Sequence, residues 1–378
     1  MNEENELNIL MEPEVEYEDI SNGVVMEKPF NPTEIDIKQK NLSIDILIKR
    51  LSAKPIPEID LYPDFQRKDD LWDAAKQSRL IESILISFPL PAFYFDGSNN
   101  NKWLVVDGLQ RLSSLRNFVV NKNLKLTGLE FLNTLEGKSF DDLPRTMQRQ
   151  IEEAQIVAYI INPGTPEEVK YNIFKRVNTG GLLMEPQEIR HAINQGIPAK
   201  FVADLASSKE FKEATENKIK TDRMLDREFV TRYVAFYIKP VSEYQPDLDS
   251  YMSQRMADLK LLSEKEREKM KHDFIESMKL AKAVFTNWTF RKVFNKNERL
   301  KPINKALFEV WSVSLAKLTD DERKRLKVKG KELFENFINL MNDDETFVAA
   351  ITSTTGDKTR VSYRFIKISD LIKRTLQT

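Results

Sequence analysis

The feature that most constrains the fold is an abrupt change of hydrophobic pattern between residues 104 and 118. Residues 104–106 are all apolar, as a buried strand requires, whereas apolar residues recur at helical spacing from 112 to 118. The polar residues between them include Asp107, Gly108 and Arg111. The sequence therefore predicts a strand that passes directly into a helix through a polar turn.

This turn allows two interpretations. Gly108 can adopt a backbone conformation that other residues resist, and the free amides of the following helix would point into the turn, which is anion-binding geometry. Arg111 would add a planar, permanently charged guanidinium suited to phosphate. In the alternative interpretation, Asp107 caps the helix and Arg111 is an ordinary surface residue. The local sequence leaves both open.

Composition excludes several other chemistries. The chain has 378 residues, a formal net charge of -1, no cysteine and two histidines. Its length suffices for two domains, and any nucleic-acid binding would need a local basic face. The lack of cysteine excludes disulfides, thiolate nucleophiles and thiolate metal sites. No apolar run is long enough to span a membrane and the amino terminus is acidic, so we expect a cytoplasmic protein that does not contact membranes.

The pattern changes along the chain and predicts three parts. Residues 1–34 are expected to form a solvated acidic tail, because acidic residues dominate them. Residues 35–195 mix strand and helix patterns, and residues 196–378 are helical almost throughout. The predicted class is therefore α+β, with a mixed-sheet core followed by a mostly α-helical domain.

Several elements follow from the spacing of apolar residues. Helices are predicted over 44–51, with Ile46 and Leu47 on the apolar side, and over 73–88, with Phe88 on the apolar side. Strands are predicted over 91–96 and 102–107, joined as a hairpin by 97–101, and over 156–161. In the second half, the aromatic residues of 229–237 are expected to form a helical core face rather than a platform for nucleobases.

Two further polar clusters resemble the first in composition. Each lies at a predicted junction between elements and carries arginine with an amide or a carboxylate. The second comprises Asp64, Gln66 and Arg67, and the third comprises Arg176, Asn178, Glu188 and Arg190. Their arginines suit phosphate, and their carboxylates suit a hydrated magnesium ion or a proton. Convergence of all three clusters on one pocket is a hypothesis.

Other catalytic motifs are missing. The sequence has no Walker-type loop, no glycine-rich dinucleotide fingerprint and no Gly-x-Ser-x-Gly elbow. His191 and His272 have no second histidine at ligand spacing, so we expect structural roles for both and no zinc site.

The ordered motifs resemble those of a known family, the amino-terminal domain of GmrSD-type restriction endonucleases. The resemblance covers about residues 35 to 195 and depends on four stretches in order: Phe65-Gln66-Arg67, residues 78–91, residues 106–112, and residues 174–181 followed by Glu188-Ile189-Arg190. It implies a ParB/sulfiredoxin-like core with a helical domain behind it, and nucleotide binding or hydrolysis in defence against foreign DNA. In related defence proteins the motif Asp-Gly-Gln-Gln-Arg is tied to hydrolysis of nucleoside triphosphates.

This chain departs from the family in two respects. Leu109 stands where the family usually has glutamine, which favours binding over hydrolysis. The His-x-x-Pro signature of the family's HNH nuclease half is also absent, since neither His191 nor His272 is followed by that pattern. The resemblance therefore implies a standalone member whose nuclease, if it has one, is a separate subunit.

The predicted site combines these observations. Catalytic roles fall to Asp107, Gln110, Arg111 and Gln66; phosphate or nucleotide binding to Arg67, Gly108, Arg111, Arg176, Asn178 and Arg190; and metal binding to Asp107 and Asp64. The expected ligands are a nucleoside triphosphate and Mg²⁺, and the expected partners are DNA, a separate nuclease subunit and further copies in an oligomer. The main hypothesis is a nucleoside triphosphatase. The alternatives are a non-hydrolysing ParB-like module that binds nucleotide or DNA, and a metal-dependent DNA nuclease.

Overall fold

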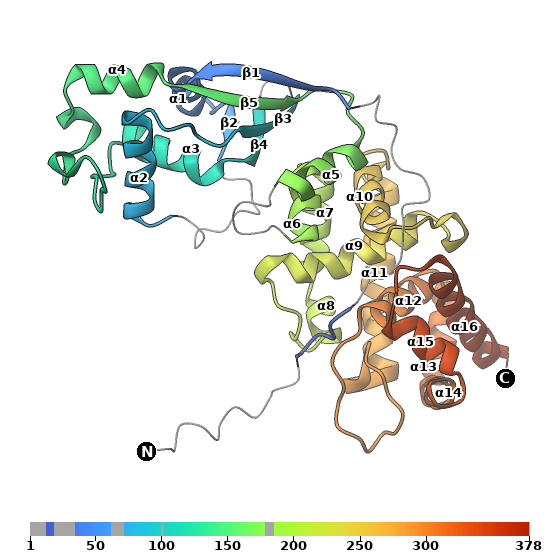
Figure 1. Cartoon of the computed structure of the whole chain (residues 1–378). Coiled ribbons are helices and arrows are strands. Elements are labelled where there is room, and N and C mark those ends of the chain that lie inside the picture. The colour runs from blue at the N-terminus through green and yellow to red at the C-terminus, as the bar shows by residue number, and fades with distance from the viewer. Residues whose placement is uncertain (1–12, 19–34, 62–71, 100–101, 178–184, 378) are drawn as a thin grey trace, which may run out of the picture. The chain divides into compact units, whose positions relative to one another are not determined.

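The computed structural model describes residues 13–18, 35–61, 72–99, 102–177 and 185–377. The chain divides into two compact units, which we name the sheet unit (Phe30–Ile193) and the helical unit (Met1–Pro29 with Asn194–Thr378). Figure 1 shows the elements of each unit. The predicted α+β class, a mixed sheet followed by a mostly helical region, is confirmed.

The sheet unit is built on a mixed sheet of five described strands in the order β1-β5-β3-β4-β2. Pairs β1/β5 and β3/β4 are antiparallel, whereas β5/β3 and β4/β2 are parallel. The strands are β1 (Ile37–Ser43), β2 (Ile59–Asp60), β3 (Phe93–Asn99), β4 (Lys102–Asp107) and β5 (Gln155–Ile161). The predicted hairpin is β3 and β4, and the strand predicted over 156–161 is β5, so both predictions are confirmed.

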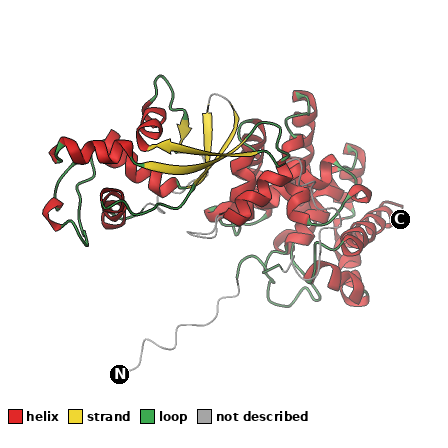
Figure 2. Ribbon diagram, turned by 45° about the horizontal axis from the view of Figure 1, so that its top comes forward, coloured by secondary structure: helices red, strands yellow, loops and turns green. Residues whose placement is uncertain are grey.

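Figure 2 shows the helices of the sheet unit in red and its strands in yellow. The helices are α1 (Ile44–Ser52), α2 (Ala74–Leu85), α3 (Leu109–Leu115), α4 (Arg145–Glu153), α5 (Glu167–Val177) and α6 (Pro186–Ile193); a π-helical turn (Arg116–Val120) continues α3, and 3-10 turns span Asn133–Leu135 and Phe140–Asp142. The core contains Phe93, Phe95, Trp103, Val105 and Leu112, with apolar residues from α1 and α2. Phe93 and Phe95 of β3 therefore face this core.

Two helix predictions need correction. The helix predicted over 73–88 ends at Leu85, because Ser87 adopts a left-handed backbone conformation (φ 60°) that turns the chain away. Phe88 consequently leaves the apolar face and is 55% exposed, with its ring edge against Phe131. Ile46 is also exposed, since α1 buries Leu47 but turns Ile46 outward.

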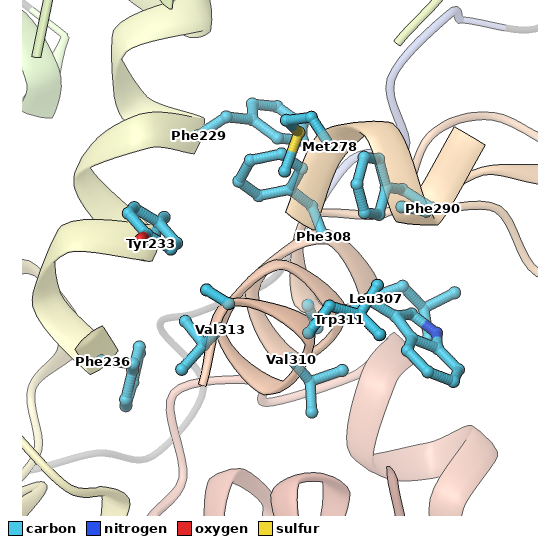
Figure 3. Packing of buried hydrophobic residues seen from close by; sticks show 14 of the residues in the cluster. Phe229, Tyr233, Phe236, Met278, Phe290, Leu307, Phe308, Val310, Trp311 and Val313 are labelled. Atoms are coloured by element: carbon cyan, nitrogen blue, oxygen red, sulfur yellow. The ribbon is translucent and has the colours of Figure 1, made fainter. Parts of the chain in front are cut away.

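The helical unit consists almost entirely of helices. They are α7 (Ile197–Ser207), α8 (Lys209–Ala214), α9 (Leu225–Ile238), α10 (Leu248–Asp258), α11 (Glu264–Phe285), α12 (Lys305–Ala316), α13 (Asp320–Val328), α14 (Gly330–Asp343), α15 (Glu345–Thr352) and α16 (Lys358–Gln377). Figure 3 shows Phe229, Tyr233 and Phe236 of α9 on the side that faces α12, where Phe308 packs edge-on against Phe229. The aromatic face of α9 is therefore core, as predicted. No described helix is long and apolar enough to cross a membrane.

The acidic segment of residues 13–18 differs from the expected solvated tail. Val15 forms a parallel bridge with Ile303, and the Glu16 amide donates to the Ile303 carbonyl oxygen at 2.8 Å. Glu18 pairs with Arg232, whose side chain is completely buried. The segment is held because its carboxylates meet cations of the helical unit, which composition alone does not reveal.

Candidate functional site

The turn after β4 is shaped by a close approach that only glycine allows. Gly108 has φ 102°, and a Cβ atom at this position would lie 2.4 Å from Cδ1 of Phe93. The pairing of β3 with β4 shifts register here, since Tyr94 pairs with Asp107 while Phe95 pairs with Val105. The irregularity ends the strand and leads directly into α3, as the sequence predicted.

Arg111 clamps this turn from inside. Its guanidinium donates to the Asp107 carboxylate at 2.6 Å, to the Ala92 carbonyl oxygen at 3.2 Å and to the carbonyl oxygen of Pro91, and it lies 4.4 Å from the centre of the Phe93 ring. Only 9% of the side chain is exposed. Arg111 is therefore no ordinary surface residue, and Gly108 rather than Asp107 occupies the N-cap position of α3. The local alternative interpretation is wrong in both respects.

Asp107 remains partly accessible despite this clamp. Its side chain is 32% exposed. Burial raises the pKa of Asp107 above its ordinary value, although Arg111 and the Gly108 amide oppose the increase. A carboxyl group with a raised pKa at the end of a strand can hold a metal ion or exchange a proton.

Gln110 connects the turn to the beginning of α2. The Trp72 amide donates to its Oε1 at 2.9 Å, and the Trp72 carbonyl oxygen accepts from Gln77 at 2.6 Å. Leu109, where the chain departs from the family motif, packs against the core of the sheet unit. A side chain in that orientation serves packing, so the departure leaves the polar residues of the turn in place.

The arginines of the third cluster lie on α5 and α6. Arg190 is completely buried, donates to Gln187 at 2.8 Å and lies 5.9 Å from the centre of the Tyr171 ring. Glu188 accepts from the Glu185 amide at 2.7 Å, near the start of α6. Arg176 is exposed in the last turn of α5. These contacts assign Arg190 to helix packing and leave Arg176 accessible.

Four predicted residues lie outside the described part of the chain: Asp64, Gln66, Arg67 and Asn178. The convergence of the three clusters therefore stays a prediction. His191 is buried within α6, where the sequence analysis expected a structural role. Among the described residues, no group of three or more His, Cys, Asp or Glu could hold a metal ion.

The sequence analysis missed an aromatic pair beside Asp107. Tyr94 on β3 and Tyr159 on β5 stack with ring centres 4.9 Å apart and an interplanar angle of 19°. Burial, Tyr159 and Asp107 all raise the pKa of Tyr94. The alternation of Tyr94 with the core residues Phe93 and Phe95 was the available signal, because it places Tyr94 on the opposite face of the strand.

Comparison with known proteins gives one match. Residues 48–194 match the family model described as "GmrSD restriction endonuclease, N-terminal domain". The match covers most of the sheet unit, including the Asp107 turn and both α5 and α6. No curated protein and no solved structure matches the chain.

Proposed function

We propose that this chain, whose residues 48–194 form an N-terminal domain of the GmrSD family, is a component of a prokaryotic DNA-restriction or anti-phage defence system. Within it, the sheet unit binds and hydrolyses a nucleoside triphosphate, and cutting of DNA belongs to a separate nuclease subunit. The second part of the proposal is supported by residues 1–378, in which neither histidine begins a His-x-x-Pro signature.

The single observation that carries the nucleotidase proposal is the state of Asp107. The carboxyl group is fixed by a buried arginine yet is itself 32% exposed, and burial raises its pKa. A carboxylate that fastens a loop through several hydrogen bonds has a lowered pKa, as Glu82 does in the same unit. The Asp107 carboxylate is accessible at the turn that precedes α3. A ligand bound at this turn could therefore contact the carboxylate oxygens directly.

The surrounding side chains have different roles in this proposal. Asp107 orients water or holds Mg²⁺, and Arg111 positions Asp107 rather than binding phosphate directly, because its donors are already used within the turn. The Tyr94 and Tyr159 pair offers an aromatic surface to the base. The exposed Arg176 binds phosphate in this proposal, together with the predicted cation of the second cluster, Arg67.

The donor set fits Mg²⁺ only together with the nucleotide. Magnesium at nucleotide sites is usually held by one or two carboxylates plus substrate phosphates and water. Asp107 supplies such a carboxylate, and Asp64 is the predicted second one. When bound, the ion neutralises charge on the phosphates.

The test is phosphate release from ATP, GTP, CTP and UTP by the purified full-length chain. We expect Asp107→Asn to reduce turnover by at least about a hundredfold. Asp141→Asn is the matched control, because Asp141 is an exposed aspartate of the same unit paired with Lys122. Equal turnover in wild type and Asp107→Asn would remove the assignment.

A second experiment separates positioning from phosphate binding. Arg111→Lys keeps the charge but loses the planar fork that reaches three acceptors. If Arg111 positions Asp107, kcat falls by about a hundredfold while KM changes little. A large rise in KM at unchanged kcat would instead mean that Arg111 binds the phosphates.

The alternative is a regulatory module that binds nucleotide or DNA without hydrolysis. It is favoured by Leu109, which lacks the amide that the family motif carries and packs against the core instead. Tight nucleotide binding without phosphate release would establish this alternative. Plasmid cleavage with magnesium or manganese by the chain alone would favour a nuclease.

A further inference from the structure

The helical unit contains a cavity of about 350 Å³ that lies far along the chain from the Asp107 turn. Its walls come from the end of α7, from α8, from the loop that follows α8 and from the start of α9. The residues used below include Phe211, Lys212, Thr215, Ile219, Lys220 and Asp226. A cavity of this size is at the lower end of the range for small-molecule sites.

Asp226 is the unusual member of this lining. It belongs to the first turn of α9, is 9% exposed, and its Oδ1 atom has no hydrogen-bond partner among the described residues. Burial raises the pKa of Asp226, against the opposing effect of the Arg227 amide and the charges of Arg227 and Lys212. A buried polar atom without a partner destabilises a fold, so native proteins rarely keep one without a reason.

The cavity changes character from its floor to its mouth. Phe211, Thr215 and Ile219 are 2%, 1% and 7% exposed, so they form a largely apolar floor next to Asp226. The Thr215 hydroxyl is already used, since it donates to the Phe211 carbonyl oxygen at 2.8 Å. Lys212, Lys220 and Asp222 are exposed and line the cavity as well, so two cations face one carboxylate at the mouth. A ligand that matches this order has an N–H donor at its inner end and an anionic group at its outer end.

The connection between α8 and α9 also has unusual backbone conformations. Glu216, Asn217, Arg223 and Met224 all have φ between 55° and 57°, although none is glycine. Such conformations destabilise a chain and are frequent at ligand-binding segments. These backbone conformations are consistent with a binding site, but the choice of ligand depends on Asp226 and the two lysines.

We propose that this cavity binds a nucleotide, with the base directed at Asp226 and the phosphate at Lys212 and Lys220. A base supplies flat N–H donors that suit an apolar floor with one carboxylate, and two lysines suit the charge of one phosphate. Guanine is the expected base, because it places a ring N–H beside an amino group and one carboxylate can accept from both. A metal ion fits poorly beside two lysines, because like charges repel. An amino acid has a single carboxylate, which would pair with only one of the two lysines.

The test is titration calorimetry of the full-length chain with GMP, AMP, CMP, UMP and guanosine. Monophosphates are chosen because the site proposed in the sheet unit acts on triphosphates. We expect GMP to bind most tightly, guanosine at least tenfold more weakly, and the double variant Lys212→Ala/Lys220→Ala to reduce GMP affinity to that of guanosine. Asp226→Asn should weaken GMP binding at least tenfold.

Asp258→Asn is the matched control, because burial also raises the pKa of Asp258 while its carboxylate pairs with Arg255. Asp226→Asn should fold normally and retain or increase its Tm, since it removes a carboxylate whose charge burial disfavours. Equal GMP affinity in wild type and Asp226→Asn would overturn the proposal.

A short guanine-containing single strand serves as a separate arm of the experiment. If it binds through Asp226 and free GMP does not, the ligand is a nucleotide within a strand; if neither binds at millimolar concentration, the proposal is wrong. The two proposals can be refuted independently of each other. We expect Asp226→Asn to leave triphosphate hydrolysis in the sheet unit intact, and Asp107→Asn to leave GMP binding in the helical unit intact.

Discussion

Glu18 provides the sharpest test of how the acidic amino-terminal segment stabilises the helical unit. Its carboxylate accepts from both terminal nitrogens of Arg232, one of them at 3.1 Å, and from the Thr355 hydroxyl. The Arg232 side chain is completely buried and that of Glu18 is 7% exposed. Burial alone would lower the pKa of Arg232, but Glu18, Glu228 and Glu309 outweigh it and raise that pKa above its ordinary value.

The expected loss can be estimated from these contacts. Removing one partner of a buried ion pair typically destabilises a protein by about 3 to 5 kcal/mol. Glu228 and Glu309 still contact Arg232 at 3.3 and 3.4 Å, and glutamine keeps the shape and one acceptor. We therefore expect Glu18→Gln to lower the free energy of unfolding by about 2 to 3 kcal/mol, near the value for one hydrogen bond to a charged group.

Differential scanning calorimetry of the full-length chain measures this effect. For a unit of this size, about 2 to 3 kcal/mol corresponds to a Tm decrease of roughly 4 to 12 °C. Glu14→Gln is the matched control within the same segment, since Glu14 pairs with Lys218 at the surface with side chains 47% and 44% exposed. Exposed pairs contribute about 0 to 1 kcal/mol.

Comparing the Tm shifts of the two variants can also refute the described docking of residues 13–18. Equal Tm shifts for Glu18→Gln and Glu14→Gln would mean that residues 13–18 do not dock as described. Added salt should remove any effect of Glu14→Gln but preserve most of the effect of Glu18→Gln, because buried pairs are screened weakly.

Three further predictions concern the sheet unit and use urea unfolding. Gly108→Ala should lower stability by about 3 kcal/mol or more, since the new Cβ would lie 2.4 Å from Phe93 and φ is 102°; a loss below 1 kcal/mol would contradict the geometry. Burial tends to raise the pKa of Glu82, but hydrogen bonds from the amides of residues 130–132 outweigh this effect and lower that pKa. Glu82→Gln should therefore lower the free energy of unfolding by about 2 kcal/mol at pH 7. The difference between the variant and the wild type should become smaller below pH 4.5, where the carboxylate becomes protonated. Asp107→Asn should lower stability at pH 7, because the buried Arg111 loses its ion-pair partner. The loss should stay below the range of about 3 to 5 kcal/mol typical of a buried pair, because burial raises the pKa of Asp107 and its charge opposes folding there; a loss within that range would indicate a structural role.

Helices and strands were predictable where residues close together in the sequence determine them. Two stretches with strand patterns, 91–96 and 102–107, flank a glycine and several asparagines, so the β3–β4 hairpin followed from the sequence. The end of α2 was missed because Ser87, a residue with no special backbone freedom, adopts a left-handed conformation. Nothing in the helical periodicity of residues 80–88 signals that turn.

The site was predictable in composition but not in contacts. Asp107 and Arg111 are four residues apart and were expected to act together, yet the carbonyl oxygens that also hold Arg111 belong to Pro91 and Ala92, about twenty residues earlier. The partners Glu18 and Arg232 are 214 residues apart. Tertiary structure selects such partners, and no local pattern identifies them.

Glu82 differs from Asp107 and Asp226 in the direction of its pKa shift. Glu82 receives amides from three successive residues, so folding favours its charged form and the side chain fastens a loop. Asp107 and Asp226 show the opposite direction, because burial disfavours their charge and their partners do not fully compensate. Asp107 is accessible at a turn, and Asp226 lines a cavity, where its Oδ1 atom has no hydrogen-bond partner within the described part of the chain. Asp258 and Glu309 show the same direction within ion pairs to Arg255 and Arg364, so the direction alone does not identify a binding site. The accessibility of Asp107 and the cavity beside Asp226 are the physical reasons for placing one binding site at each of these two residues.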